Sequence, residues 1–193
     1  MEAPSADIGL IKQCQEGSLA AFDELVLRHH KKVFNVAYRL LNNYEEANDI
    51  AQEVFVRAFR AIKGFRFKAQ IFTWLYRITV NLSKNRLKVL AREKRRTISL
   101  DDPISTEEGE MKRQVAQDDP LPSDDLINKE KGELIAKALA SLEDEFRTVV
   151  VLRDIEGLGY EEISRILKIN IGTVKSRLHR ARALLQEKLK EVV

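Results

Sequence analysis

The chain contains few residues that could carry out catalysis or bind a metal. Asp49 and Glu53 are four residues apart, so on a helix their carboxylates share one face and could hold a divalent cation. His29 and His30 are adjacent and point about 100° apart on a helix, which does not suit a shared metal. One cysteine, Cys14, and three histidines give no zinc-ligand spacing. Because no third ligand accompanies the carboxylate pair, we expect neither an enzyme nor a bound metal or other cofactor.

Basic side chains are concentrated in two segments. Residues 57–96 carry 13 basic groups and one acidic group, and residues 163–190 carry 8 and 1. Between them, residues 101–128 hold nine acidic and two basic groups and three of the four prolines. Ordinary surfaces mix both signs, so two basic blocks separated by an acidic stretch indicate two modules that contact a polyanion such as nucleic acid.

Helical periodicity runs through both halves of the chain, and no segment shows the convincing alternation of a β-strand. The sequence therefore predicts an all-α protein with two small helical domains joined by an acidic flexible linker. We place the N-terminal domain at residues 1–96, the linker at 97–125 and the C-terminal domain at 126–193. We expect helices near residues 7–15, 18–41, 45–63, 71–95, 126–140, 144–156, 161–168 and 171–191, with all four prolines outside them.

The composition excludes a membrane protein. Charged residues make up 33% of the chain, and no stretch approaches the roughly 20 apolar residues that a spanning helix needs. Residues 1–9 lack the basic start and the apolar run of a signal peptide. We therefore expect the protein in the cytoplasm.

Residues 160–182 have the pattern of a helix-turn-helix. A short helix with an acidic start is followed by a tight turn and a basic helix, the order in which a recognition helix enters the major groove. The expected contacts to duplex DNA are Arg153, Thr173, Lys175, Ser176, His179 and Arg180. Arg180 has the forked guanidinium that suits guanine, whereas Thr173 and Lys175 suit phosphates.

A second basic region combines aromatic and basic side chains in a loop at residues 65–70 and in the helix after it. Single-stranded nucleic acid is held in this way, because bases stack on rings next to charges that bind phosphates. Asn81 lies among positive charges and can read a base edge through its amide. Trp74 is as compatible with a core position as with DNA, and Tyr76 is expected to be structural. The expected contacts to melted DNA are Phe65, Phe67, Lys68, Trp74, Arg77, Asn81, Lys84 and Lys88.

The predicted helix at residues 45–63 carries an apolar side chain in the middle of a polar face. Val56 lies there with Asp49, Gln52 and Glu53, an arrangement that exposure to solvent does not require. Acidic groups would repel DNA, so this mixture suits a protein partner. Composition alone favours the alternative of an ordinary amphipathic helix.

Three motifs, in this order along the chain, are similar to one known family. The core-polymerase-binding helix of bacterial RNA polymerase sigma factors, in the extracytoplasmic-function (ECF) branch, resembles DIAQEVFVRAFRAIKGF. The promoter-opening helix of that family resembles FTWLYRITVNLSKNRLK, and its promoter-reading end resembles GLGYEEISRILKINIGTVKSRLHRARALL. The chain departs from the family pattern at Gly159 (usually Ser or Thr), at Asn170 (usually Pro), and at Phe67 and Lys68 (often Gly-Asp).

The resemblance implies a transcription initiation factor without an active site of its own and without a small-molecule substrate. The C-terminal domain would read the minus-35 element as duplex DNA. The N-terminal domain would melt and hold the minus-10 element, with a flipped base in the 65–70 loop. Asp49, Gln52, Glu53 and Val56 would bind core RNA polymerase. Because members of this branch are usually held inactive by an anti-sigma factor, often a membrane-bound one, such a partner is expected.

Two other classes of protein remain open from the residues alone. A stand-alone helix-turn-helix activator or repressor would dimerise and bind DNA tightly by itself, but this class leaves the basic aromatic region unexplained. A nucleic-acid enzyme would need further acidic, histidine or cysteine side chains around a pocket.

Overall fold

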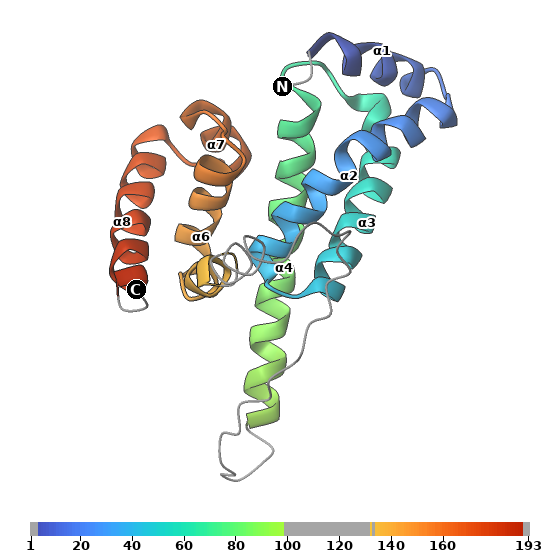
Figure 1. The fold of residues 1–193 in the computed structure, drawn as a ribbon. Coiled ribbons are helices and arrows are strands. Elements are labelled where there is room, and N and C mark those ends of the chain that lie inside the picture. The colour runs from blue at the N-terminus through green and yellow to red at the C-terminus, as the bar shows by residue number, and fades with distance from the viewer. Residues whose placement is uncertain (1–3, 99–131, 133, 191–193) are drawn as a thin grey trace, which may run out of the picture.

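The structure is a computed structural model that describes residues 4–98, 132 and 134–190 (Figure 1). Its elements are α1 (Pro4–Gln15), α2 (Leu19–Leu41), α3 (Tyr44–Ala61), the 3-10 turn η1 (Ile62–Gly64), α4 (Ile71–Ile98), α6 (Asp144–Val150), the π-helical turn η2 (Val151–Ile155), α7 (Tyr160–Leu167) and α8 (Ile171–Lys190). Residues 134–140 are also helical. No strand occurs in the described ranges, and the expected all-α class is confirmed.

The helices begin and end within a few residues of the predicted positions, with two differences. Pro4 lies inside α1 and not outside the helices, because the first helical position needs no backbone N–H donor and suits the fixed φ of proline. The α4 helix continues through residue 98, so it includes the first two residues assigned to the linker. The rest of the predicted linker and the predicted start of the C-terminal domain lie outside the described residues.

Polar caps fix how the first helices follow one another. The Ser18 side chain accepts a hydrogen bond from the backbone N–H of Ala21 over 3.3 Å and begins α2. Asn42 ends α2 in a left-handed conformation with φ 52°. Asn43 then accepts a hydrogen bond from the backbone N–H of Glu46 over 3.1 Å and begins α3. The two asparagines therefore reverse the chain within two residues, and α3 packs against α2.

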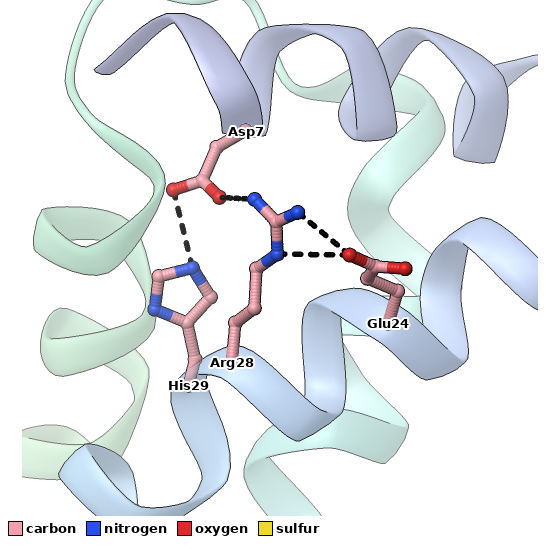
Figure 2. A network of polar contacts seen from close by, with 4 residues as sticks. All are labelled: Asp7, Glu24, Arg28 and His29. Atoms are coloured by element: carbon pink, nitrogen blue, oxygen red, sulfur yellow. Dashed lines mark hydrogen bonds and ion pairs between the residues drawn. The ribbon is translucent and has the colours of Figure 1, made fainter. Parts of the chain in front are cut away.

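Helices α1 to α4 enclose the first hydrophobic core, in which Leu25, Val33, Val54 and Leu75 are fully buried. A polar network at the start of α1 adds to this packing (Figure 2). Asp7 forms an ion pair with Arg28 at 3.6 Å and a hydrogen bond with the Nε2 atom of His29 at 3.2 Å, and Arg28 also bonds Glu24 at 2.6 Å. The network fixes α1 on α2.

A second hydrophobic core joins α6, η2, α7 and α8, and it extends into the N-terminal half of the chain. Val36 and Leu40 of α2 and Tyr76 and Val80 of α4 belong to this second core. Val36 and Leu40 are therefore covered by the second core, although Leu25 and Val33 of the same helix belong to the first. Figure 1 shows α7 beside α4, so the two helical modules pack directly on each other.

The predicted helix at residues 144–156 is not a uniform α-helix. Its second half, η2, has a π turn in which the backbone N–H of Glu156 bonds the Val151 carbonyl over 3.0 Å. Gly157 then ends the segment with φ 72°, a conformation that glycine adopts without strain. None of the described helices is long and apolar enough to cross a membrane.

Candidate protein and nucleic-acid interfaces

The polar face of α3 is at the surface, as the sequence predicts. Asp49 and Gln52 are exposed, and Val56 is 43% exposed although it is apolar. Glu53 is half-buried and forms an ion pair with Arg57 over 2.6 Å. We call the four residues of the expected polymerase contact, Asp49, Gln52, Glu53 and Val56, the docking face. Within the described residues, no group of three histidine, cysteine, aspartate or glutamate side chains could hold a metal ion.

A bidentate ion pair joins the helix of the docking face to α4. The Arg86 guanidinium donates hydrogen bonds to both carboxylate oxygens of Glu46, over 2.5 and 2.6 Å. The hydrogen bond from Arg86 holds the pKa of the Glu46 carboxyl below its usual range. This pair was not singled out in the sequence, because the two residues are 40 positions apart and each lies in a charged segment. It links α3 to α4.

The loop at residues 65–70 presents an aromatic cluster at the start of α4. The Phe65 ring lies 5.3 Å from the rings of both Phe67 and Trp74. Phe67 has a left-handed backbone with φ 55°, a conformation that disfavours a side chain with a Cβ atom. A glycine would adopt this conformation without strain. Phe67 and Lys68 are exposed on the loop.

The predicted DNA-binding face of α4 is partly open to solvent. Asn81 and Lys88 are exposed, whereas Trp74, Arg77 and Lys84 are half-buried. Burial lowers the pKa of Lys84, and the charge of Arg177 on α8 lowers this pKa further. Lys84 is therefore close to the C-terminal module, while Asn81 and Lys88 face solvent.

The neighbouring face of α4 binds acidic residues of the C-terminal module. The Tyr76 hydroxyl donates a hydrogen bond to the Glu156 carboxylate over 2.5 Å, and Thr73 donates a longer one of 3.5 Å to Glu162. Tyr76 is only 3% exposed, which confirms its expected structural role. The partner is unexpected, because the second module and not the first supplies the hydrogen-bond acceptor.

Arg147 at the same interface is only 8% exposed, and each of its three guanidinium nitrogens has a hydrogen-bond partner. Its guanidinium donates to four backbone carbonyls: those of Leu40, Leu139, Ala140 and Leu142, over 2.6–3.0 Å. Leu40 lies at the end of α2, and Leu139 and Ala140 at the end of the helical segment 134–140. A cation between two helix C-termini satisfies carbonyls that would otherwise lack donors. No pattern in the sequence indicated this role, because a charged residue in an acidic segment suggests solvent exposure.

Residues 160–182 form the expected helix-turn-helix, which consists of α7 and the first part of α8. The Glu162 carboxylate accepts from the backbone N–H of Gly159 over 3.0 Å, which completes the start of α7 without a capping side chain at Gly159. Lys168 turns the chain with φ 55°. Asn170 then caps α8, because its side-chain oxygen accepts from the backbone N–H and from the hydroxyl of Thr173, over 2.8 and 3.0 Å. Its position directly before the first helical residue is the signal that could have identified this cap.

The polar side of α8 points into solvent. Four of the six expected minus-35 contacts are exposed and a fifth, Thr173, is half-buried; the exposed ones are Lys175, Ser176, His179 and Arg180. The apolar side is internal, with Val174, Leu178 and Ala181 buried. The predicted orientation of the helix is therefore observed, and DNA contact by each residue stays a prediction.

Three other arginines of this module have partners within the protein. Arg153 donates to the Leu158 carbonyl over 2.8 Å, and its guanidinium lies 4.9 Å from the centre of the Tyr160 ring. Arg177 pairs with Glu145 and Arg182 pairs with Asp154, each at 2.5 Å. Arg153 thus stabilises the turn before α7, and its contact with DNA stays a prediction.

Comparison with known proteins agrees with this architecture. The model of Sigma-70 region 2 matches residues 25–93, and that of Sigma-70 region 4 matches residues 132–185. The chain is 39% identical to the ECF RNA polymerase sigma factor SigW of Bacillus subtilis over 183 residues, which are 94% of this chain and 96% of SigW. It is 33% identical to the ECF RNA polymerase sigma-E factor of Escherichia coli over 196 residues, covering 100% of this chain and 99% of that protein.

Two solved structures have the same fold. CnrH in complex with the cytosolic domain of CnrY has a TM-score of 0.68 at 24% identity, and the alignment covers 96% of this chain and 98% of CnrH. RpoE in complex with the anti-sigma factor NepR, from Bartonella quintana, has a TM-score of 0.63 at 27% identity, covering 88% and 96%.

A helical protein with sigma regions 2 and 4 is a transcription initiation factor. This chain belongs to the ECF RNA polymerase sigma factors, which direct RNA polymerase to promoters.

Proposed function

We propose that the two modules of this sigma factor have separate promoter contacts. The exposed side of α8 reads the minus-35 element as duplex DNA, while the 65–70 loop and α4 melt and hold the minus-10 element. The observation that carries this division is the aromatic cluster of Phe65, Phe67 and Trp74, because Trp74 belongs to α4, the helix that also carries the basic residues Arg77, Lys84 and Lys88. Rings that offer stacking surfaces next to phosphate-binding charges suit a single strand, whereas the exposed side of a recognition helix suits a duplex.

The docking face is the proposed contact with core RNA polymerase. Its exposed Val56 supplies apolar area, and the carboxylates of Asp49 and Glu53 exclude DNA and favour a basic or mixed protein surface. Because the Glu46–Arg86 pair joins α3 to α4, a polymerase bound to the docking face would also determine where α4 meets the promoter.

An anti-sigma factor is the second proposed protein partner. CnrH and RpoE, which share the fold of this chain, were each solved in a complex, with the cytosolic domain of CnrY and with the anti-sigma factor NepR respectively. We infer that this chain is bound in the same way when it is inactive, by a factor that is either membrane-bound or free. Its place of action would be the cytoplasm, where RNA polymerase acts, and it would have no catalytic activity of its own.

Transcription in vitro tests the proposed function. Core RNA polymerase is incubated with a library of randomised promoters, with and without the chain, and the transcripts are sequenced. We expect specific starts only in the presence of the chain, with a shared minus-10 and minus-35 pattern. A stand-alone regulator would instead bind DNA tightly without polymerase and would produce no new starts with core polymerase alone.

A further inference from the structure

Gln15, the last residue of α1, contacts the beginning of the 65–70 loop. We call this segment the minus-10 loop after its proposed contact. The side-chain amide nitrogen of Gln15 donates hydrogen bonds to the carbonyl of Ile62, over 3.1 Å, and to the carbonyl of Phe65, over 2.9 Å. These acceptors follow 47 and 50 residues later in the chain. Ile62 begins the turn after α3, and Phe65 is the first residue of the 65–70 loop. Gln15 also precedes the segment that matches Sigma-70 region 2, residues 25–93.

The position of Gln15 is fixed from both sides. On its own helix, Ile11 and Cys14 are buried in the first core, and the start of α1 is held by the Asp7 network of Figure 2. After Gln15, the chain turns through Gly17, whose φ of 100° suits glycine, and the backbone N–H of Ser18 bonds the Gln13 carbonyl over 2.9 Å. The backbone that carries the Gln15 side chain is therefore held on both sides.

The loop needs support of this kind. Phe67 has a left-handed backbone that is unfavourable for a residue other than glycine. The aromatic cluster stabilises it, but this cluster depends on the direction of the Phe65 ring, which contacts both Phe67 and Trp74. Since the Phe65 carbonyl is bound by Gln15, the backbone that orients this ring is held by α1.

We propose that Gln15 is a positioning residue for the minus-10 loop. Its two hydrogen bonds hold the Phe65 backbone so that the Phe65 ring, Phe67 and Trp74 form one surface for the captured base. The N-terminal helix thereby contributes to promoter specificity without touching DNA. This inference rests on the proposed function of the loop, and two experiments separate the failure of one from the failure of the other.

The first experiment uses the full chain without polymerase or DNA. Trp74 is the single tryptophan of the protein, so its fluorescence reports on the aromatic cluster alone. Gln15→Met keeps the length of the side chain and removes both donors. We expect quenching of Trp74 by iodide to increase about twofold in this variant, because the Phe65 ring no longer covers the indole. Gln13→Met, an exposed glutamine of the same helix, should leave quenching unchanged, and Gln15→Lys, which keeps a donor, should restore most of the protection.

The second experiment measures base preference. Core polymerase transcribes from promoters that carry each base at every minus-10 position, with a constant minus-35 element. We expect Gln15→Met to lower the preference at the captured position about fivefold, the scale of losing one or two hydrogen bonds. The preference at minus-35 positions should change less than twofold, and Gln13→Met should behave as the wild type.

Three results would overturn the inference, and a fourth would overturn the proposed function of the loop. Unchanged iodide quenching in Gln15→Met overturns the inference, as does an equal loss of preference at minus-10 and minus-35 positions. Failure of both Gln15→Met and Gln15→Lys to melt cooperatively also overturns it, because Gln15 would then be needed for the whole fold. If the wild type shows no minus-10 preference at all, the proposed function fails, whereas increased quenching would still support the contact between Gln15 and the loop.

Discussion

Tyr76 of α4 and Glu156, directly after η2, form a 2.5 Å hydrogen bond between the two modules. The residues are 80 positions apart, and the bond is next to the α4 face that carries Arg77 and Asn81. Burial raises the pKa of the Tyr76 hydroxyl, and the hydrogen bond to the Glu156 carboxylate raises it further. The phenol is therefore kept neutral as a donor to a charged acceptor.

Replacing Tyr76 by phenylalanine should destabilise the fold, and the loss of stability should depend on pH. Below pH 10, we expect Tyr76→Phe to lower the free energy of unfolding by about 1–2 kcal/mol, since the acceptor is charged. The folded-state pKa of Tyr76 is raised, so its contribution is complete below the unfolded pKa of about 10 and is lost as the pH rises beyond it. Urea unfolding at pH 7 and above pH 10 should show the difference from wild type decreasing. Tyr44→Phe, at an exposed site, is the control, and an equal effect at this site would contradict the prediction.

The Glu46–Arg86 ion pair between α3 and α4 should stop contributing to stability at acid pH. We expect Arg86→Met to cost about 1–2 kcal/mol of unfolding free energy at pH 7. Because the folded-state pKa of Glu46 is lowered, the contribution is present above the unfolded pKa and is lost as the pH falls through the folded one. The variant and the wild type should therefore converge towards pH 3 in urea titrations. The matched control is Arg57→Met, which removes an exposed ion pair with Glu53 worth only about 0.5 kcal/mol.

The docking face should be needed for polymerase binding and not for folding. Asp49→Ala combined with Glu53→Ala should change stability by no more than about 0.5 kcal/mol per site, while affinity for core polymerase falls clearly. Co-purification and a binding titration with core polymerase measure this effect. A control with the same charge change combines Glu16→Ala and Asp23→Ala, both at exposed positions. If the two double variants bound core equally well, the docking face would be assigned to the wrong surface.

Two exposed cations on α8 should have different effects on promoter binding. We expect Arg180→Ala to cost about 1–3 kcal/mol and to relax the preference at one minus-35 position. Lys175→Ala should weaken all sequences alike and reduce the salt dependence of binding. Arg182→Ala, which removes a cation already paired with Asp154, should leave base preference intact. A uniform loss in Arg180→Ala, measured over all single-base variants, would make Arg180 a phosphate contact.

The left-handed residue of the loop should prefer glycine to alanine. Phe67→Ala keeps the Cβ atom and loses the ring contact with Phe65, whereas Phe67→Gly loses the same contact and relieves the backbone. We therefore expect Phe67→Gly to be more stable than Phe67→Ala by about 1 kcal/mol in thermal or urea unfolding. In an ordinary extended or helical segment the order is reversed, so an advantage for alanine would show that the loop has another conformation in solution.

Local patterns in the sequence predicted the helices and the exposed faces well. The exposed side of α8 with Ser176 and Arg180 and the exposed Val56 on α3 are both as expected. These features depend on residues three or four apart on one helix, and a 3.6-residue period shows them directly.

The packing between modules could not be predicted in the same way. Periodicity shows that Val36 and Leu40 are apolar and share a side, but it does not show which element covers them. Arg147 and Gln15 likewise donate hydrogen bonds to backbone carbonyls that are distant in sequence. Because every residue has a backbone carbonyl, the residue type does not show which one accepts. The π turn of η2 was missed for a related reason, since its residues fit an α-helix equally well.

The Asn170 cap also limits what Thr173 can recognise. The hydroxyl proton of Thr173 is donated to Asn170, so while this hydroxyl bond is in place the Thr173 oxygen can only accept a hydrogen bond. A DNA phosphate has no proton to give, whereas the amino groups of adenine and cytosine in the major groove do. While the hydroxyl bond is in place, we therefore expect position 173 to suit an amino-bearing base better than the phosphate suggested by the sequence. With proline at position 170, as is usual in the family, no side chain there would accept this proton, and the same threonine would be able to donate to the backbone of DNA.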